Sequence, residues 1–365
     1  MTGAIAQIDT HATWGGGQYQ VLALTRGLHA RGVPVVLFAR GDGELARRAQ
    51  QAGLPVVGVP PVFASRWHPG GGHFLAQWCA ERRVALLHAH DGRALTLAER
   101  AARRGRWPVI AARRIASPLR RDPISRLKYS PGRVAAIVAT SRPVAAIVGA
   151  TGFPEDRIHV VESATDQAAL QATLPDEQLR RWADGRPLAG SAGRLVPKKN
   201  WALLLRAAAV LRDRGRDLRW VIAGDGPERE ALCGLRRQLG LDDHVRLVTD
   251  GRNPEAVVKA LDVLLHPARR EGGAAIVRVA MLARVPIVAT TAPALVDALE
   301  GGGLTVDPDD ATAAAEAVAR VLEDGDVRAR LVEDAFAVAQ RRFGLDAMVQ
   351  RTLRVYEAVL GSRGR

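Results

Sequence analysis

The sequence predicts an α/β protein made of two doubly wound domains in tandem. Short runs of β-branched and apolar residues alternate with segments of helical periodicity, a pattern typical of parallel sheets with helices on both faces. Runs such as VALL and AAIVA suit strands that are covered on both sides. The alternation stops once, over a polar stretch that contains prolines, and then restarts. We therefore expect two domains of similar size rather than one continuous sheet.

The first domain is expected to span residues 1–163. Its predicted strands are Ala4–Ile8, Val33–Phe38, Val56–Val59, Val84–His88, Pro108–Ala111, Val134–Ala139 and Ile158–Val161. Its predicted helices are Gln18–Ala30, Glu44–Ala52, Phe74–Arg82, Ala94–Arg103 and Pro143–Ala150. Ligands of such sheets bind at the carboxyl ends of the strands, so residues that follow a strand are the first candidates for chemistry.

Residues 164–187 are predicted to link the domains, because the stretch is polar and holds Pro175 and Pro187. It carries one short helical segment around Glu177–Trp182. The second domain is expected to span 188–344. Its predicted strands are Leu188–Ala192, Leu218–Ala223, Val245–Val248, Val263–Leu265, Ile287–Ala289 and Leu304–Val306. Its predicted helices are Trp201–Arg212, Glu228–Leu239, Pro254–Ala260, Ala275–Ala283, Ala311–Leu322 and Val327–Arg341.

A last helix, Leu345–Leu360, is predicted within the closing segment 345–365. With two doubly wound units in one chain, we expect the ligand site in a cleft between them.

The composition is that of an ordinary globular protein. Of the 365 residues, 47% are hydrophobic and 25% are charged, which excludes wholesale disorder. The two cysteines form no CxxC motif, and the first residues show no signal-peptide pattern, so we expect a reducing, cytoplasmic location. No apolar run approaches the ~18 residues of a membrane-spanning helix.

The charge balance is unusual. The formal net charge is +14, and only four of the 52 cationic side chains are lysines. Arginine-rich surfaces attract phosphates, nucleic acid or anionic lipid, although compositional drift toward arginine explains such a surplus equally well. Aromatic residues make up only 4%, and no known nucleic-acid reading module is present. We therefore expect no nucleic-acid partner.

One basic segment stands out within the first domain, from Arg113 to Arg133. Seven cations oppose a single acid, Asp122, and apolar residues are interleaved among them. The segment would suit anionic lipid or a phosphorylated, lipid-linked glycan, and the alternative is a solvated basic loop. The candidate acceptor or membrane residues are Arg113, Arg114, Arg120, Arg121, Arg126 and Lys128. They predict peripheral contact with the inner face of the plasma membrane.

A glycine run, Gly15-Gly16-Gly17, lies between the first strand and the first helix. Such a loop lets a ligand approach the backbone, and the helix N-terminus offers free N–H groups and the positive end of a dipole. The alternative is a flexible turn. The spacing is not GxGxxG, so a dinucleotide site is disfavoured.

The segment GRLVPKKN, residues 193–200, also joins a strand to a helix. Arg194 ends the strand and Lys199 begins the helix, so both are expected to point at one crevice. Two cations beside a helix N-terminus suit a diphosphate, whereas the alternative is a solvated basic turn. The later turn GDGPER, residues 224–229, is predicted to be mainly structural.

Two further motifs offer polar side chains at strand ends. Glu271 precedes Gly272 and Gly273 at the start of a helix, where it would accept sugar hydroxyls or simply cap the helix. His90 ends the motif HAH, and a strand-end histidine would bind a substrate hydroxyl or serve a structural role. No spacing indicates a metal site. GxxxxGK[ST], GxSxG and HExxH are absent, which disfavours P-loop hydrolases, serine esterases and zincins.

In this order and spacing, the motifs resemble the retaining glycosyltransferases of family 4, which have the GT-B fold of two Rossmann-like domains facing across a cleft. The resemblance covers nearly the whole chain. It implies that a nucleotide diphosphate-sugar is bound mainly by the second domain and the acceptor by the first, with no other cofactor and no metal. It also implies that the last helix packs back on the first domain.

Site residues follow from the resemblance. Arg194 and Lys199 correspond to the pair that binds the diphosphate. Gly16 and Gly17 correspond to the loop that approaches it.

The resemblance also assigns residues that would bind the donor sugar. His90 corresponds to the histidine near the donor sugar, and Glu271 to the first glutamate of the E-x7-E motif. Gly272 and Gly273 would bring backbone amides to the sugar or phosphate.

The donor motifs also depart from the family pattern. Val279 stands where the second glutamate, which binds the ribose, is usual. Losing two hydrogen bonds to that carboxylate would cost about 2–4 kcal/mol. The usual EGFG is EGGA, Ala283-Arg284 replaces CG, and Thr290–Pro293 replaces a glycine-rich turn. We therefore expect a hexosyltransferase acting on a cell-envelope glycan or lipid-linked acceptor, and the alternative is a weakened or inactive homologue that binds nucleotide-sugar or glycan.

Overall fold

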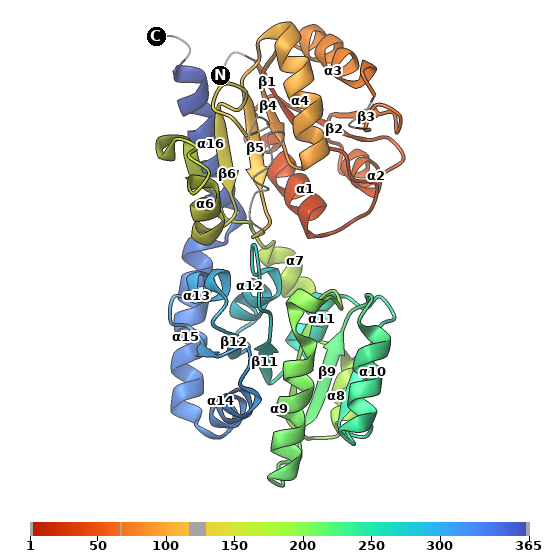
Figure 1. The fold of residues 1–365 in the computed structure, drawn as a ribbon, viewed down its shortest axis with the longest axis vertical. Coiled ribbons are helices and arrows are strands. Elements are labelled where there is room, and N and C mark those ends of the chain that lie inside the picture. The colour runs from red at the N-terminus through yellow and green to blue at the C-terminus, as the bar shows by residue number, and fades with distance from the viewer. Residues whose placement is uncertain (1–2, 66–67, 117–128, 363–365) are drawn as a thin grey trace. The chain divides into compact units, whose positions relative to one another are not determined.

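The structure is a computed structural model that describes residues 3–65, 68–116 and 129–362. The chain forms two compact units, one of residues 1–164 with 345–365 and the other of residues 165–344. Each unit is a parallel sheet with helices on both faces (Figure 1). This confirms the predicted fold class of two Rossmann-like α/β domains.

The sheet of the first unit has seven strands in the order β3-β2-β1-β4-β5-β6-β7, and each neighbouring pair is parallel. The order reverses beside β1, the kind of switch point at which ligands bind in open α/β sheets. The strands are β1 Ala4–Asp9, β2 Val35–Arg40, β3 Val56–Val59, β4 Val84–Ala89, β5 Val109–Arg113, β6 Ala136–Ala139 and β7 Ile158–Val160.

Six α-helices and one 3₁₀ turn cover this sheet in the described residues. They are α1 Gly16–His29, α2 Glu44–Gln51, α3 Gly70–Glu81, α4 Gly92–Gly105, α6 Arg142–Gly149, α16 Leu345–Gly361 and the 3₁₀ turn Glu155–Arg157. Helix α3 begins four residues before the predicted Phe74. Its glycines are helical because α3 lies very close to its neighbours: a Cβ on Gly71 would lie 2.6 Å from the carbonyl oxygen of Phe63.

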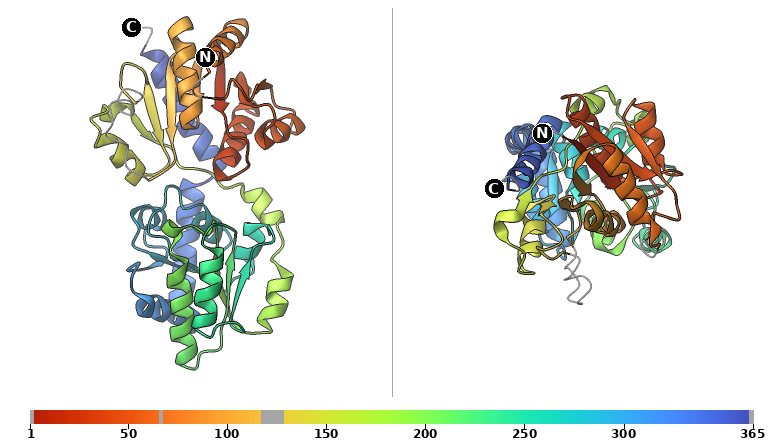
Figure 2. Two further views of the ribbon diagram at one scale, coloured as in Figure 1. Left: turned by 45° about the vertical axis from the view of Figure 1, so that its right-hand side comes forward. Right: turned by 90° about the horizontal axis from the view of Figure 1, so that it is seen from above.

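Helix α16 completes the core of the first unit, although it follows the whole second unit in the chain. Val349 and Tyr356 are fully buried and share one apolar cluster with Ile5 and Leu86. Gly27 of α1 has no room for a side chain, because a Cβ there would collide with Val349. Figure 2 shows this dark blue helix lying within the first unit.

The sheet of the second unit has six strands in the order β10-β9-β8-β11-β12-β13, all parallel. The order again reverses, here beside β8, so the two sheets have switch points in corresponding places. The strands are β8 Leu188–Ala192, β9 Arg219–Ala223, β10 Val245–Val248, β11 Val263–His266, β12 Ile287–Thr290 and β13 Leu304–Val306.

Aspartates and one asparagine begin many of the helices of the second unit. The side chains of Asp166, Asp176, Asn253, Asp310 and Asp324 each accept a hydrogen bond from an N–H of the following turn. The helices are α7 Gln167–Ala172, α8 Glu177–Ala183, α9 Trp201–Asp213, α10 Arg229–Gln238, α11 Pro254–Lys259, α12 Ala275–Leu282, α13 Pro293–Leu299, α14 Ala311–Glu323 and α15 Gly325–Arg342, with a 3₁₀ turn at Pro197–Lys199.

The stretch expected to be a linker is instead part of the second unit. Leu170 of α7 and Leu179 and Ala183 of α8 are buried in its core. The short helix predicted around Glu177–Trp182 is confirmed as α8, whereas α7 was not expected, because its apolar residues are too widely spaced in a polar stretch to give a clear period. Helix α13 was also not expected; it begins at Pro293, which suits the first turn of a helix.

None of the helices in the described residues combines the length and the apolar character that a membrane crossing requires.

Candidate functional site

Polar residues of the first unit gather where β1, β4 and β5 end. These strands are neighbours in the sheet, and they are followed by His90 after β4 and Arg114 after β5. Because parallel strands end at the same edge, the topology brings these side chains together with Gly15–Gly17 at the start of α1.

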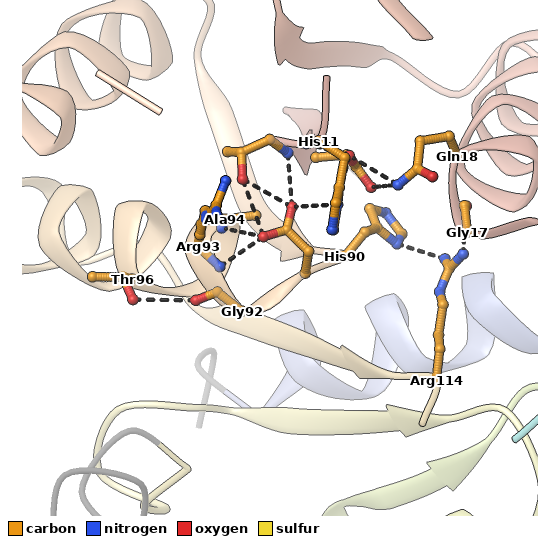
Figure 3. Close-up of polar contacts among 12 residues, drawn as sticks. His11, Gly17, Gln18, His90, Gly92, Arg93, Ala94, Thr96 and Arg114 are labelled. Atoms are coloured by element: carbon orange, nitrogen blue, oxygen red, sulfur yellow. Dashed lines mark hydrogen bonds and ion pairs between the residues drawn. The ribbon is translucent and has the colours of Figure 1, made fainter. Parts of the chain in front are cut away.

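Arg114 joins two of the predicted site elements. Its Nη1 donates to the carbonyl oxygen of Gly17 at 2.7 Å, and its Nη2 lies 2.8 Å from Nδ1 of His90 (Figure 3). Burial lowers the pKa of Arg114 to about 10, opposed by the charges of Asp9 and Asp91, so the guanidinium remains protonated at neutral pH. The structure thus places Arg114, expected on the acceptor side, in one cluster with Gly17 and His90.

His90 is buried, and both of its ring nitrogens have partners. Its Nε2 lies 2.6 Å from Oε1 of Gln7, and its Nδ1 faces Arg114. Burial, with the charges of His88 and Arg114, lowers the pKa of His90 well below its usual value. The ring is therefore neutral at physiological pH.

The glycine loop leaves the N-terminus of α1 open. A Cβ added to Gly16 or Gly17 would meet no atom within 4 Å. The N-cap residue, Gly15, offers no side-chain bond, and the first turn holds no acidic residue. These features leave the positive end of the helix dipole uncompensated, which favours an anion there.

Beside this cluster lies an ion-paired triad that the sequence analysis missed. The Nδ1 of His11 is 3.4 Å from a carboxylate oxygen of Asp9 and 3.6 Å from one of Asp91. Hydrogen bonds to Asp9 and Asp91 raise the pKa of His11 to about 10. Burial alone would raise the pKa of Asp91, but hydrogen bonds from His11 and from backbone N–H groups lower it to about 2.

Ligand atoms of these three residues lie within 4.8 Å of one another, as they would around a metal ion. With its raised pKa, His11 supplies a positive charge between the two carboxylates at neutral pH. The signal for this triad is visible in the sequence, because each aspartate stands at or just after the end of one of two adjacent strands, in IDTH and HAHDG.

The basic segment of the first unit is only partly described. Arg113 is buried and Arg114 turns toward Gly17 and His90, so neither belongs to an exposed basic surface. The expectation of a membrane-facing surface is therefore wrong for these two side chains. The remaining candidate cations, Arg120, Arg121, Arg126 and Lys128, lie outside the described residues.

In the second unit, the loop of Arg194 follows β8 and is supported by the turn GDGPER. Gly224 and Gly226 have positive φ angles of 147° and 156°, and a Cβ on either would overlap the backbone of Gly193 or Leu195. The N–H of Leu195 donates to the carbonyl of Asp225 at 2.9 Å. The turn predicted to be structural thus shapes the candidate diphosphate loop.

Arg194 itself is exposed, and within the described part of the chain its guanidinium makes no ion pair. Its carbonyl accepts a hydrogen bond from Nε1 of Trp201, which fixes the backbone below the side chain. The pKa of neighbouring Lys198 is lowered, mainly by burial and further by the charges of Arg194, Lys199 and Arg270. The loop therefore concentrates positive charge.

Lys199 and Glu271 are in direct contact, so the structure brings two predicted residues together from the loops that follow the neighbouring strands β8 and β11. His266, the last residue of β11, holds the same carboxylate, with its Nε2 3.2 Å from Oε1 of Glu271. Behind it, Nδ1 of His266 lies 3.1 Å from Oγ of Ser191. Sequence reasoning missed His266 and Ser191, both fully buried.

Electrostatics keep this carboxylate charged. Burial would raise the pKa of Glu271, but the hydrogen bond from His266 and the charge of Lys199 lower it well below its usual range. Burial also lowers the pKa of His266, which is therefore neutral and donates its Nε2 proton to Glu271. The arrangement presents an oriented carboxylate and an ammonium at the edge of the sheet.

Gly272 and Gly273 form a bend between Glu271 and α12. The next residue, Ala274, has φ 45° and ψ 42°, a left-handed conformation that favours glycine. Val279 lies inside α12 with 7% of its surface exposed, packed in the core of the second unit. It presents no polar group to a ligand.

Comparison with known proteins decides the family. Residues 14–168 match the family described as Glycosyltransferase Family 4, and residues 176–338 match Glycosyl transferases group 1. The chain belongs to the GT-B glycosyltransferases of family 4. The two matches together follow the two units of the chain in order.

Two relatives come from Streptomyces kanamyceticus. An alpha-D-kanosaminyltransferase is 30% identical over 216 residues, which are 57% of this chain and 56% of the relative. A 2-deoxystreptamine glucosyltransferase is 33% identical over 236 residues, 61% of this chain and 60% of the relative. The chain thus matches between half and two thirds of the length of these curated relatives.

A solved structure with the same fold is HepE of Anabaena in complex with UDP and glucose. It has a TM-score of 0.81 and 18% identity, and the match covers 98% of this chain and 100% of HepE. At this identity the likeness shows the fold alone.

Proposed function

We propose that this chain transfers a hexose from a nucleotide diphosphate-sugar to a hydroxyl group of an acceptor, with retention at the anomeric carbon. Membership of the family supports transfer in general. The observation that carries the proposal is the contact between Lys199 and Glu271, because it sets a cation for phosphate and a carboxylate for sugar hydroxyls side by side.

The second unit is proposed to hold the donor. Arg194 and Lys199 would neutralise the diphosphate as its bond to the sugar breaks, while the amides of Gly272 and Gly273 supply directional N–H groups. Glu271, held by His266, would accept hydrogen bonds from the sugar. Fixed cations of the protein can stabilise the leaving group in this way without a metal.

In the first unit, Gly16, Gly17 and His90 are proposed to bind donor groups, and this unit is proposed to bind the acceptor. The open N-terminus of α1 favours an anionic group, and Arg114 adds a charge next to it. In a retaining reaction of this family the departing phosphate itself would help to take the proton of the acceptor hydroxyl. Positioning then supplies much of the remaining acceleration.

The proposed acceptor is a cell-envelope glycan or a lipid-linked glycan, bound at the cytoplasmic face of the membrane. The cation-rich segment that follows β5 supports this proposal. A small acceptor such as 2-deoxystreptamine is the second candidate, supported by the name of one relative. Sedimentation with anionic vesicles, compared with neutral ones, separates the two: salt-sensitive binding to anionic vesicles supports the membrane acceptor.

A different candidate function is binding without turnover, which the burial of Val279 favours. A valine in the core cannot replace the ribose-binding glutamate of the family. Such a protein would bind nucleotide-sugars and release no nucleoside diphosphate.

The test is a thermal-shift screen over nucleotide diphosphate-sugars, followed by assay of the stabilising donor with each acceptor class. A donor at about 100 times its Kd stabilises the folded state by about 2.7 kcal/mol. Stabilisation together with release of nucleoside diphosphate and an α-linked product from an α-linked donor supports retaining transfer. Stabilisation without turnover supports the binding protein, and no stabilisation by any donor contradicts both proposals.

A further inference from the structure

A buried chain of polar side chains connects α16 to His90. The phenolic oxygen of Tyr356 accepts a hydrogen bond from Nε2 of Gln7 at 2.8 Å, and Oε1 of the same amide lies 2.6 Å from Nε2 of His90. Tyr356 also lies 2.7 Å from Nδ1 of His88. All four side chains are buried, with exposed fractions between 0% and 6%.

Only one placement of the protons on His90 and Gln7 satisfies their contacts. A guanidinium donates hydrogen bonds and accepts none, so Nδ1 of His90 must be the acceptor for Arg114. The proton of the neutral His90 ring is then on Nε2, and it is donated to Oε1 of Gln7.

The orientation of the Gln7 amide toward Tyr356 follows from the same argument. With its oxygen engaged by His90, the amide of Gln7 must direct its NH₂ group at Tyr356. The same oxygen of Tyr356 also shares a hydrogen bond with Nδ1 of His88. Arg114, His90 and Gln7 thus each fix the hydrogen-bonding role of the next group.

We propose that Tyr356, acting through Gln7, is a positioning residue that holds His90 in its Nε2–H form with Nδ1 facing Arg114. The proposal rests on the proposed function only where it concerns sugar transfer. In this state the His90 ring has no free N–H for a ligand. A hydrogen bond from these residues to the sugar donor or the acceptor therefore comes from Arg114, whose guanidinium has further N–H groups besides the two that bind Gly17 and His90. His90 acts on the ligand through Arg114.

The surroundings keep His90 in this neutral form. The charged or titratable groups that face it are His88, 4.1 Å away between ring centroids, and Arg114. Asp9 and Asp91 act on Arg114 rather than on the ring. Burial lowers the pKa of His88 to about 3, so protonation of either ring is unfavourable above mildly acidic pH.

If Tyr356 had only a structural role, the core would require its aromatic ring but not its hydroxyl group. Y356F keeps the ring in the core and removes the oxygen that orients Gln7. Q7L removes the amide itself. Y129F is the matched control, because it removes a phenolic hydroxyl elsewhere in the first unit.

The experiment is NMR of the full-length protein labelled with ¹⁵N-histidine, with the His90 signals assigned by their loss in H90N. In wild type we expect protonated Nε2 and unprotonated Nδ1, unchanged between pH 8 and pH 5.5. In Y356F and Q7L the two forms should exchange or the ring should titrate, whereas Y129F should resemble wild type. With a donor from the screen, Y356F should lower kcat/KM about tenfold, the effect of one buried hydrogen bond.

Two results would overturn the proposal: a wild-type His90 that carries its proton on Nδ1, or a Y356F protein whose His90 signals match wild type. The NMR measurement needs no turnover. If the signals behave as expected and no sugar is transferred, the proposed function fails and the positioning role stands. If transfer occurs and Y356F leaves the His90 signals unchanged, only the positioning role fails.

Discussion

The ammonium of Lys199 and the carboxylate of Glu271 contact each other directly in the second unit. The cation proposed for the diphosphate is thus already neutralised by the group proposed for the sugar. A bound phosphate must share Lys199 with Glu271, so the contact couples the two halves of donor recognition. Together with the hydrogen bond from His266, it keeps Glu271 ionised despite its burial, since the pKa of this carboxyl is held well below the usual range.

This coupling predicts opposite effects of E271Q on binding and on transfer. Removing the carboxylate charge frees Lys199, so a nucleoside diphosphate should bind at least as tightly as in wild type, while sugar transfer should fall by ~100-fold. Calorimetric titration with the nucleoside diphosphate and initial-rate assays check this. Weaker binding in E271Q would show that Lys199 does not act on the diphosphate.

Arg194 offers a test that is free of folding effects. It is exposed, and in the described residues it makes no ion pair, so R194A should unfold at the same urea concentration as wild type. Loss of a charge-assisted contact to the leaving group should lower kcat/KM by ~100-fold or more. R237A, which removes an exposed arginine of α10, is the control and should leave kcat/KM unchanged. Equal turnover in R194A and R237A would remove Arg194 from the donor site.

Ala274 predicts a stabilising substitution. Its φ of 45° is unfavourable for a residue with a Cβ, so A274G should raise the free energy of unfolding by about 1 kcal/mol. The control A317G changes an alanine inside α14, where glycine should cost about 0.5–1 kcal/mol instead. Urea unfolding of both variants measures whether the free energy of unfolding rises in A274G and falls in A317G. Destabilisation by A274G would mean that packing of the Ala274 methyl group stabilises the protein by more than the backbone strain costs.

The triad of Asp9, His11 and Asp91 predicts a pH dependence at the alkaline side. The pKa of His11 is about 10 in the folded protein and about 6.5 in the unfolded chain, so the folded state binds the extra proton between these values. The stabilisation is complete below pH 6.5 and is lost as the pH rises toward 10. The free energy of unfolding should fall over this range. The slope should be smaller than that expected for the release of one complete proton, because His11 is half exposed to solvent.

In H11Q this alkaline slope should be reduced, and the two proteins should converge in slope below pH 6. Urea unfolding at pH 6, 7.5 and 9 measures the difference. An unchanged slope in H11Q would show that His11 does not hold the extra proton.

Several short strands were predicted with the correct ends. The bounds of β3, β8, β10 and β13 are those expected, because short, mainly apolar runs flanked by turn or polar residues leave little choice of ends. Helix α3 was predicted to start too late, since glycines read as a loop until the close approach of Phe63 is known. Helices α7 and α8 were taken for a linker for the related reason that only tertiary burial makes Leu170 and Leu179 core residues.

The sequence was sufficient to name those candidate site residues that follow a predicted strand. Lys199 and Glu271 could be named from their motifs, but their contact depends on the pairing of β8 with β11, which brings the loops after these strands together. Ser191 and His266 look like ordinary strand residues in the sequence. Tyr356 reads as one more apolar position of the last helix, and only the fold shows that its hydroxyl meets Gln7 and His88.

The first unit is assembled from both ends of the chain, with α16 filling the face lined by Ile5, Leu28 and Leu86. During synthesis on the ribosome these apolar side chains emerge early, and their covering helix emerges only after residues 165–344. The second unit is continuous in sequence, so it can fold co-translationally while the hydrophobic face of the first unit is still exposed to solvent. This delay makes the nascent first unit a natural client for chaperones and a point at which premature termination would leave an aggregation-prone product.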